Sequence, residues 1–451
     1  MSRWKSVVYL AIVTSKDLMV RRMMWLISGF FLVGYMVTIP RREMSQRLLL
    51  KSRRSWHFSI QDDLVKRLLP VEAGVSSSGV ALEKRFIVLK LPAFDTAGRV
   101  CIEKGVILIK FTESFLPFLH ETNIAELVKY FRIVLEPSWA GYALESILAW
   151  ARPEYGRTII FCPEVDDLRF IERLDGGLVP VDIGASDWVD ERVFYPIDGE
   201  EKTYDSIYVA NYNSIKRLHR YFKALSRISI AGYRGAIVCS SWGGGRAKIL
   251  QLLDYYGLSE KLTVYEDLRQ EEINALLNKS KVNMLLSYKE GANKSVFEGF
   301  FAGTPAIVLK NNIGLNKSHI NSRTGHLIDD ADLERELEWF HSHWKEFDAA
   351  RWARENISPR VTAAKLNQTL RNIALKEGEA WSLDIVAKVN SPELNYYLAS
   401  DPSVRSRMNT ELLDVFGKGS KSIDMPQLRA FLDRWRSEFF STESIGAGVV
   451  Q

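Results

Sequence analysis

One stretch in the second half of the chain, residues 282–309, constrains the fold more than any other. It reads VNMLLSYKEGANKSVFEGFFAGTPAIVL. Apolar runs of strand length, Val282–Leu286 and Ala306–Leu309, stand at its two ends, and a short helical pattern lies between them. Gly303 and Pro305 follow that pattern, where glycine can end a helix and proline prevents it from resuming. The stretch therefore predicts strand, loop, helix and strand, the unit from which parallel sheets are built.

The loop between the first of these strands and the helix is a predicted ligand site. Ligands of parallel sheets bind beyond the carboxyl ends of the strands, where this loop would lie. Glu290 and Glu298 stand eight positions apart, one before the helix and one inside it. Lys294 and Ser295 stand at the helix start, where free backbone N–H groups favour a phosphate. Two such carboxylates could bind two sugar rings joined by a diphosphate, one being the ribose of a nucleotide.

A simpler interpretation of the same residues stays open. Ser295 and Glu298 fit a capping box, in which the serine caps the helix and the glutamate bonds back to the N–H of the cap. Glu298 would then only stabilise the helix start, and Glu290 would be a solvated acid of the loop.

The stretch resembles the signature of the family 4 glycosyltransferases, which are retaining enzymes with the GT-B fold. That signature is an apolar strand, Ser, a few residues, Glu-Gly, six residues, Glu, and a helix that ends in Gly-Thr-Pro. The chain matches it at Ser287, Glu290, Gly291, Glu298, Gly303, Thr304 and Pro305. The resemblance implies that Glu290 faces the donor sugar and that Glu298 binds the ribose. It places the diphosphate at Asn293, Lys294 and Ser295.

A segment upstream resembles another part of the same domain. The strand-like run Ser206–Ala210 leads to a loop and then to a helical pattern that opens with Lys216 and Arg217. In the family this loop carries Gly-Arg and then Lys, whose charges neutralise the diphosphate. Lys216 fits the lysine, whereas Asn211 stands where the arginine is expected, so Arg217 or Lys294 would have to replace that cation. The alternative for Lys216 and Arg217 is a solvated helix start.

Two further segments fit the nucleotide domain that the resemblance implies. Family members read the nucleotide base with backbone just after the strand that corresponds to Leu262–Tyr265, so Tyr265 is a predicted nucleotide contact. The run Gly325–Ile328 matches a later strand of the family. Phe340–Lys376 predicts helices, the last of which crosses back to the first domain in this fold.

The rest of the chain predicts an α/β protein with largely parallel sheets, and the resemblance implies the GT-B fold, two Rossmann-like doubly wound domains facing across a cleft. Strand-length apolar runs alternate with helical patterns upstream of the hinge, at Phe86–Leu91, Val106–Ile109, Phe131–Leu135 and Thr158–Cys162. The predicted parts are a basic and apolar N-terminal segment at 1–60, an acceptor-side domain at 61–200, a nucleotide-sugar domain at 201–375 and a helical C-terminal extension at 376–451.

The N-terminal segment is a predicted membrane contact. Met23–Ile39 is uncharged and mostly apolar, and its length is at the lower limit for a spanning helix. Basic residues flank it on both sides, so residues 23–54 could also lie on anionic lipid. A buried core helix, an uncleaved signal-like segment and an upstream extension translated only from Met1 are the three alternatives. The expected location is cytoplasmic and membrane-associated, with a single N-terminal span as one form.

Candidates for acceptor binding follow two strands of the first domain. Lys110, Thr112 and Glu113 come after one strand, and Glu136, Ser138 and Trp139 come after the next. Trp139 could stack on a sugar or belong to the core. Gly184, Asp187, Phe194 and Pro196 resemble the Gly-x-Asp and Phe-x-Pro elements that precede the family's hinge, with one extra residue between Gly and Asp.

Composition and motifs exclude several other classes. A formal net charge of +5 over 451 residues is too small to indicate a nucleic-acid partner. The chain has no Walker loop and no metal-ligand spacing, and Asp166-Asp167 lacks the Asp-x-Asp spacing of metal-dependent transferases. Cys101, Cys162 and Cys239 are far apart in apolar runs, which predicts buried free thiols.

The predicted function is transfer of a sugar from a UDP- or GDP-sugar to a glycan or lipid-linked acceptor, with retention of configuration and no required metal or other cofactor. Such chemistry is typical of polysaccharide biosynthesis. Glu290 and Lys216 are the predicted catalytic residues. Two alternatives remain: an inactive GT-B scaffold that binds nucleotide or glycan, and a GT-B sugar epimerase or inverting transferase.

Overall fold

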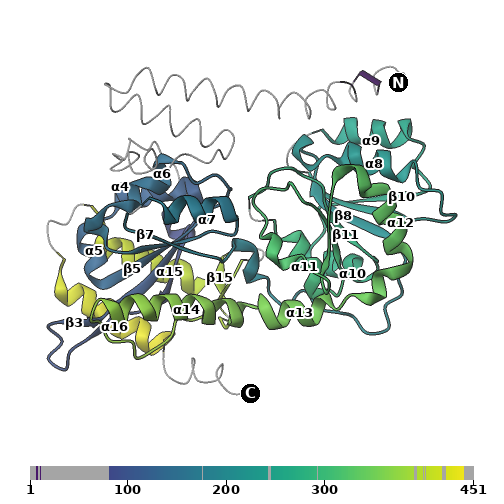
Figure 1. Ribbon diagram of the computed structural model, residues 1–451. Coiled ribbons are helices and arrows are strands. Elements are labelled where there is room, and N and C mark those ends of the chain that lie inside the picture. Colours follow the sequence, from purple (N-terminus) through teal and green to yellow (C-terminus); the bar gives the residue numbers. More distant parts are fainter. Residues whose placement is uncertain are drawn as a thin grey trace, which may run out of the picture. The chain divides into compact units, whose positions relative to one another are not determined.

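The computed structural model describes residues 7, 8 and 11 and most of residues 81–440, without 175, 242–244, 292, 391–393, 400, 402 and 419–422. Two compact units make up the described part of the chain (Figure 1). The first unit consists of residues 81–188 and 359–440, and the second unit is Val189–Ser358. The predicted membrane segment, 23–54, and the last residues, 441–451, lie outside the described residues. Within the described part, no helix has both the length and the apolar character that crossing a membrane requires.

The second unit is built on a six-stranded sheet in which every pair of neighbours is parallel. Its order is β10-β9-β8-β11-β12-β13, so the chain builds outward from β8 in one direction and then returns to β11 to build in the other. This is the doubly wound arrangement, with a switch point between β8 and β11. The strands are β8 Ser206–Asn211, β9 Gly235–Ser240, β10 Leu262–Glu266, β11 Asn283–Leu285, β12 Ala306–Leu309 and β13 Gly325–Ile328.

Helices cover both faces of this sheet because successive residues of a strand point to opposite sides. On β8, for example, Ile207 joins one apolar core and Tyr208 the other. One core contains α8 Leu218–Leu225, α9 Arg246–Tyr255 and α12 Leu333–His343. The opposite core contains α10 Gln270–Asn278, α11 Ser295–Phe301 and α13 Ala349–Asn356.

The predicted strand, loop, helix and strand of residues 282–309 is confirmed as β11, α11 and β12. Gly303 has a φ of +80°, and its N–H donates to the carbonyl of Phe300. The N–H of Thr304 donates to the carbonyl of Gly299, so the carbonyls at the helix end are satisfied by a turn that a left-handed glycine permits.

The first unit has a five-stranded sheet of order β1-β4-β5-β6-β7. Its strands are β1 Phe86–Lys90, β4 Gly105–Lys110, β5 Phe131–Glu136, β6 Thr158–Phe161 and β7 Leu178–Val181. The predicted largely parallel sheet is confirmed, although β1 runs antiparallel to β4. The edge strand β7 was not predicted, because Pro180 interrupts its pattern.

Helices from both ends of the chain pack on the first sheet in one apolar core. The earlier ones are α4 Phe115–Glu121, α5 Ile124–Tyr130, α6 Glu145–Leu148 and α7 Val165–Glu172. The later ones are α14 Pro359–Lys376, α15 Ser403–Phe416 and α16 Met425–Glu438. Two short antiparallel pairs complete the unit, β2 Ala93–Phe94 with β3 Cys101–Glu103, and β14 Lys388–Val389 with β15 Asn395–Tyr396.

Two α/β units, with residues 359–440 returning to the first, are the predicted GT-B fold. The second unit is doubly wound as predicted. The strands of the first sheet follow one another in sequence order without a reversal, so the prediction of a doubly wound first domain is wrong. The three cysteines are free thiols, and Cys162 and Cys239 are buried as predicted. Cys101 is only partly buried because it lies on β3, outside the main sheet, so that part of the prediction is wrong.

Candidate active site

The switch point of the second unit brings two predicted catalytic residues together. Lys216 follows β8 and Glu290 follows β11, and these two strands are neighbours in the sheet. The ammonium Nζ of Lys216 donates to Oε1 of Glu290 at 2.6 Å. Residues separated by 74 positions in sequence therefore form one ion pair at the place where doubly wound sheets bind ligands.

The two carboxylate oxygens of Glu290 have different surroundings. Oε1 accepts from Lys216 and also from the Ser287 hydroxyl at 2.6 Å. Among the described residues, none donates a hydrogen bond to Oε2. Only 7% of the Glu290 side chain is exposed. One oxygen is thus held in place by the protein, and the other remains open to a ligand.

A second loop, which the sequence analysis did not single out, holds the backbone around Glu290. The Glu290 N–H donates to the Ile313 carbonyl at 2.8 Å, and the amide Nδ2 of Asn312 donates to the Ser287 carbonyl at 2.8 Å. Gly314 has a φ of +113°, and a Cβ on it would lie 2.3 Å from the Glu290 carbonyl oxygen. The close approach of these two loops therefore requires glycine at 314. An Asn-x-Gly spacing after β12 was the only signal in the sequence.

Lys216 is placed by a short 3-10 helix, Ser214–Lys216. The side chain of Asn213 caps it by accepting the N–H of Ile215. From β8, the buried Tyr208 hydroxyl donates to the Lys216 carbonyl at 2.7 Å. The Leu286 N–H at the end of β11 donates to the same hydroxyl at 3.4 Å. Tyr208 therefore ties the Lys216 loop to the strand that leads to Glu290.

Asn211 and Arg217 do not supply a further cation in a simple way. Oδ1 of Asn211 accepts the N–H of Asn213 and so shapes the loop. The buried Arg217 guanidinium makes two hydrogen bonds to the Asp330 carboxylate, at 3.1 and 2.9 Å, and donates to the Leu286 carbonyl at 3.0 Å. It also stacks over the ring of Tyr288.

Arg217 comes after β8, Leu286 directly follows β11 and Asp330 comes after β13. The contacts of Arg217 therefore join the ends of three strands. Burial alone would raise the pKa of Asp330, but the Arg217 hydrogen bonds and the charges of Arg217 and Arg220 outweigh it and lower that pKa. These contacts indicate that Arg217 holds the loops together instead of binding the diphosphate. The predicted contact of Arg217 with the nucleotide stays a prediction.

At the start of α11 the structure excludes one interpretation of Glu298, the capping box with Ser295. Oδ1 of Asn293 accepts the Ser295 hydroxyl at 3.0 Å and the Val296 N–H at 3.3 Å, so Asn293 stabilises the helix start. The helix begins at Ser295, and the capping box between Ser295 and Glu298 does not form.

Glu298 is instead a buried carboxyl to which no hydrogen bond is found in the described part of the chain. Burial raises the pKa of Glu298, and the charge of Lys294 offsets part of that rise. A carboxyl in this state gains stability from a ligand that brings hydroxyl donors.

The side chain of Tyr265 is engaged by a neighbour. Its hydroxyl forms a hydrogen bond of 2.6 Å with the hydroxyl of Tyr204. Burial and this bond raise the pKa of Tyr265 to about 12. A contact of Tyr265 with the nucleotide would therefore use the backbone at the end of β10, as the sequence analysis expects, and it stays a prediction.

In the first sheet, residues from the C-terminal part of the chain bond to the carboxyl end of β5. Glu136, the last residue of β5, accepts from Lys388 Nζ at 2.6 Å and from Asn390 Nδ2 at 3.1 Å. The side chains of Glu136 and Lys388 are 1% and 0% exposed. The C-terminal part of the chain therefore holds Glu136, and this acceptor candidate is a structural residue.

The paired acids after β6 also have a structural role. Asp167 is buried, and its two carboxylate oxygens accept the N–H groups of Gly141 and Tyr142 at 2.7 and 2.9 Å. Within the described ranges, no group of three His, Cys, Asp or Glu residues is arranged to hold a metal ion.

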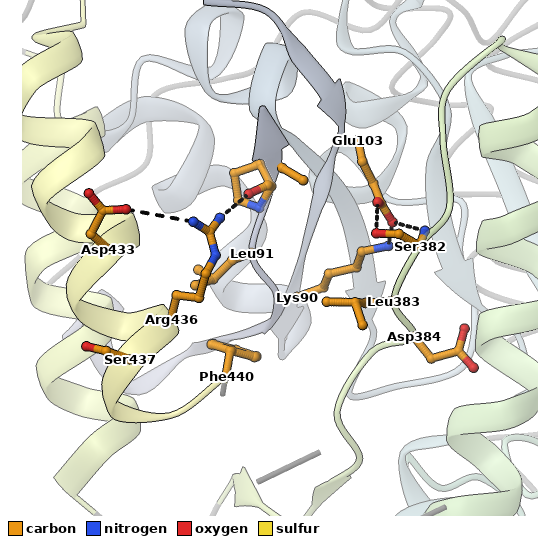
Figure 2. Close-up of a pocket in the computed structure, with 12 residues that line it drawn as sticks. Lys90, Leu91, Glu103, Ser382, Leu383, Asp384, Asp433, Arg436, Ser437 and Phe440 are labelled. Atoms are coloured by element: carbon orange, nitrogen blue, oxygen red, sulfur yellow. Dashed lines mark hydrogen bonds and ion pairs between the residues drawn. The ribbon is translucent and has the colours of Figure 1, made fainter. Parts of the chain in front are cut away.

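A cavity of about 420 Å³ lies elsewhere in the first unit (Figure 2). Lys90 and Glu103 pair on one wall, where Ser382 also donates to Glu103, and Arg436 of α16 lies on another. Because β1 is antiparallel to β4, the end of β1 at Lys90 lies at the amino ends of the parallel strands. The cavity is therefore at the edge of the sheet opposite to the one where doubly wound sheets bind ligands.

Comparison with known proteins gives one family match. Residues 192–351 match the model of the glycosyl transferases group 1 family. A search of curated proteins finds no match. Those residues include the switch point and both members of the Lys216–Glu290 pair.

Solved structures give weaker similarities. Sucrose-phosphate synthase from Thermosynechococcus elongatus has 14% identity and a TM-score of 0.47, covering 60% of this chain and 74% of that one. TarM, of S. aureus, has 14% identity and a TM-score of 0.47, covering 59% and 54%. HepE of Anabaena in complex with UDP has 12% identity and a TM-score of 0.47, covering 59% and 78%. The chain thus spans about half the length of TarM.

These sequence identities and TM-scores are too low to assign the substrate of any of these proteins to this chain. The family match and the fold are sufficient for the class. Residues 192–351 match the glycosyl transferases group 1 family, which supports a glycosyltransferase, and the two units have the GT-B fold.

Proposed function

We propose that the protein transfers a sugar from a UDP- or GDP-sugar to a glycan or lipid-linked acceptor, with retention of configuration and without a required metal ion. The observation that carries the proposal is the ion pair of Lys216 and Glu290 at the switch point of the second unit. A nucleoside-diphosphate sugar offers each member of that pair a further partner, a phosphate for the ammonium and sugar hydroxyls for the carboxylate.

Lys216 stabilises the leaving group in this proposal. As the bond between sugar and diphosphate breaks, negative charge grows on the diphosphate, and a preorganised ammonium lowers the energy of that state. The side chain is 14% exposed, so a phosphate can reach it, and Tyr208 fixes the backbone behind it. Lys294, at the start of α11, is the second cation that we assign to the diphosphate, with Asn293 and Ser295 beside it.

The two glutamates bind the two sugar rings of the donor. Glu290 presents Oε2 to the transferable sugar while Lys216 and Ser287 hold Oε1. Glu298 accepts hydroxyl groups of the ribose, which satisfies a carboxyl whose burial raises its pKa. Retention of configuration rests on the resemblance of the signature to the family 4 enzymes, and the donor screen decides between UDP and GDP.

The first experiment is a thermal-shift screen of UDP- and GDP-sugars, because a ligand that binds the folded state raises its melting temperature. Nucleotide release from the best donor is then measured for wild type and Lys216→Ala. We expect a decrease of about 10²–10³ in rate, the typical effect of removing one group that stabilises transition-state charge. Lys310→Ala, at an exposed ion pair of the same unit, is the control. Rates within threefold of wild type for Lys216→Ala would refute the assignment, and a rate abolished by EDTA would refute a metal-independent mechanism.

One observation favours a second candidate, a nucleotide-binding scaffold without turnover. Asn211 stands where the arginine is expected, and the guanidinium of Arg217, which could replace that cation, is engaged by Asp330. Calorimetric binding of a UDP- or GDP-sugar without any nucleotide release would support the scaffold. An inverting transferase or an epimerase is distinguished by NMR of the product, since only retention preserves the anomeric configuration of the donor.

A further inference from the structure

We propose that Trp139 is the platform on which the protein binds a sugar ring of a glycan acceptor. The inference rests on the proposed function and concerns the first unit, where the acceptor residues remained undefined. Trp139 follows β5 and lies at the carboxyl ends of the parallel strands, the edge where open α/β sheets bind ligands. Its side chain is 48% exposed.

The exposure of Trp139 contrasts with that of other tryptophans in the same unit. Trp150 and Trp188 are fully buried and belong to the apolar core. An exposed indole contributes little to folding and leaves a large apolar face in water. The interpretation of Trp139 as a core residue is therefore wrong, and its apolar face is accessible to a ligand.

The loop that carries Trp139 is fixed on its amino side. The Ser138 N–H donates to Oγ1 of Thr112 at 3.1 Å, and the Thr112 N–H donates to the Ser138 hydroxyl at 3.3 Å. These reciprocal bonds join the loop after β5 to the loop after β4.

The loop is also fixed on its carboxyl side, at the start of α7. The buried Asp167 carboxylate accepts the N–H groups of Gly141 and Tyr142, as described above. Gly141 has a φ of +100°, which glycine adopts without strain. Because both sides are fixed, the indole is presented without a large ordering cost on binding, which is the condition for an effective platform.

Polar groups that suit sugar hydroxyls stand beside the platform. Glu113 is exposed, and its carboxylate accepts the Ser138 hydroxyl at 3.2 Å, which places it next to the Trp139 loop. The residue that positions Thr112 and Glu113, Phe111, has a φ of +71°, a conformation that costs energy in a non-glycine residue and is found most often at functional sites. An aromatic face with an adjacent carboxylate and hydroxyls matches the C–H face and the hydroxyl edge of a pyranose ring.

The test measures glycan binding and donor chemistry on the same proteins. Wild type, Trp139→Ala, Trp139→Tyr and Leu375→Ala are applied to an array of α- and β-linked hexose oligosaccharides, and the affinity for the best glycan is measured by calorimetry. Leu375→Ala is the control, because it removes an apolar side chain of the same unit that is even more exposed, 60% against 48% for Trp139. Nucleotide release from the best donor without acceptor is measured in parallel, and melting temperatures verify folding.

We expect Trp139→Ala to bind the best glycan at least about tenfold more weakly, and to release nucleotide from the donor at the wild-type rate. Trp139→Tyr should retain most of the affinity because it keeps an aromatic face. Equal affinity of Trp139→Ala and wild type, or a wild type that binds none of the oligosaccharides, would overturn the inference. A wild type that releases no nucleotide from any donor but binds glycan through Trp139 would overturn the proposed function and leave this inference standing.

Discussion

The two units each place a lysine–glutamate pair at the carboxyl ends of their central strands, and the two pairs differ in access. Lys216 and Glu290 in the second unit and Lys388 and Glu136 in the first have the same separation, 2.6 Å between Nζ and a carboxylate oxygen. The first of these pairs is 14% and 7% exposed, whereas the second is 0% and 1% exposed.

The difference teaches which feature distinguishes a structural pair from a binding pair. Both oxygens of Glu136 are used, one by Lys388 and the other by Asn390. In Glu290, Lys216 and Ser287 share one oxygen and the other has no donor within the described residues. Burial of an ion pair therefore does not indicate function, whereas an accessible pair with an open oxygen indicates a site that a ligand can enter.

The largest effect is expected from breaking the structural pair. Lys388→Met leaves Glu136 buried without its cation, which typically costs about 3–5 kcal/mol of stability. The matched change at the other pair, Lys216→Met, should cost less, because its side chains are 14% and 7% exposed whereas those of Lys388 and Glu136 are 0% and 1% exposed. Urea unfolding of the two variants measures the contrast. A larger loss of stability in Lys216→Met than in Lys388→Met would contradict it.

An effect of similar size, on catalysis instead of stability, is expected from changing Glu290, whose Oε2 has no donor within the described residues. Glu290→Gln keeps the shape of the side chain and removes its charge, so we expect nucleotide release at saturating donor to fall about 10²-fold or more. Glu336→Gln, at a partly buried glutamate paired with His326, is the control in the same unit. If both variants slow the reaction equally, Glu290 has no special role.

The Arg217–Asp330 contact should have a moderate effect that depends on pH. Asp330→Asn removes a doubly hydrogen-bonded charge pair, for which we expect a loss of about 1–2 kcal/mol at neutral pH. Because the pKa of Asp330 is lowered on folding, its stabilisation is complete above the ordinary value of 3.8 and is lost as the pH falls through the folded value. The difference between wild type and Asp330→Asn in chemical unfolding should therefore shrink below about pH 4. A difference that is constant from pH 7 to pH 3 would exclude this origin.

A smaller effect separates positioning from packing. Tyr208→Phe and Tyr221→Phe each delete a fully buried hydroxyl, and each should cost about 1 kcal/mol of stability. Only the Tyr208 hydroxyl supports Lys216, since that of Tyr221 bonds to Ser206 at the start of β8. We expect a severalfold lower kcat with unchanged donor KM for Tyr208→Phe and wild-type kinetics for Tyr221→Phe. Identical kinetics in the two variants would show that the Tyr208 hydroxyl serves packing alone.

The smallest expected effect is an increase in stability, in contrast to the losses above. Since burial raises the pKa of Glu298, the folded state loses stability as the pH rises from the ordinary value of 4.5 through the folded value. Glu298→Gln should remove that cost at neutral pH and raise the melting temperature, by about 2–4 °C for each kcal/mol recovered. It should also reduce the stabilisation given by UDP or GDP. A variant that melts lower and responds normally to nucleotide would contradict both roles.

The sequence was sufficient for the frame of the site. The apolar runs, Gly303 and Pro305 predicted β11, α11 and β12, and the signature with Lys216 predicted two side chains that the fold brings within 2.6 Å. These features depend on local patterns, which a single sequence displays directly.

Contacts between distant segments could not be predicted. Arg217 was a candidate for binding the diphosphate. Its pairing with Asp330 could not be predicted, because the two residues lie 113 positions apart in the sequence. Glu136 was a candidate for acceptor binding. Its ion pair with Lys388 could not be predicted, because the two residues lie 252 positions apart. The support of Glu290 by Asn312 and Gly314 depends on backbone geometry that no residue pattern records.

The central claim is that Lys216 and Glu290 act on one donor as a unit, and a double-mutant cycle on kcat tests it most directly. Wild type, Lys216→Met, Glu290→Gln and the double variant are compared at saturating UDP- or GDP-sugar. Residues that act as a unit give non-additive losses, so the double variant should be about as slow as the slower single variant. Single variants that keep wild-type rates, or losses that add fully in the double variant, would contradict the claim.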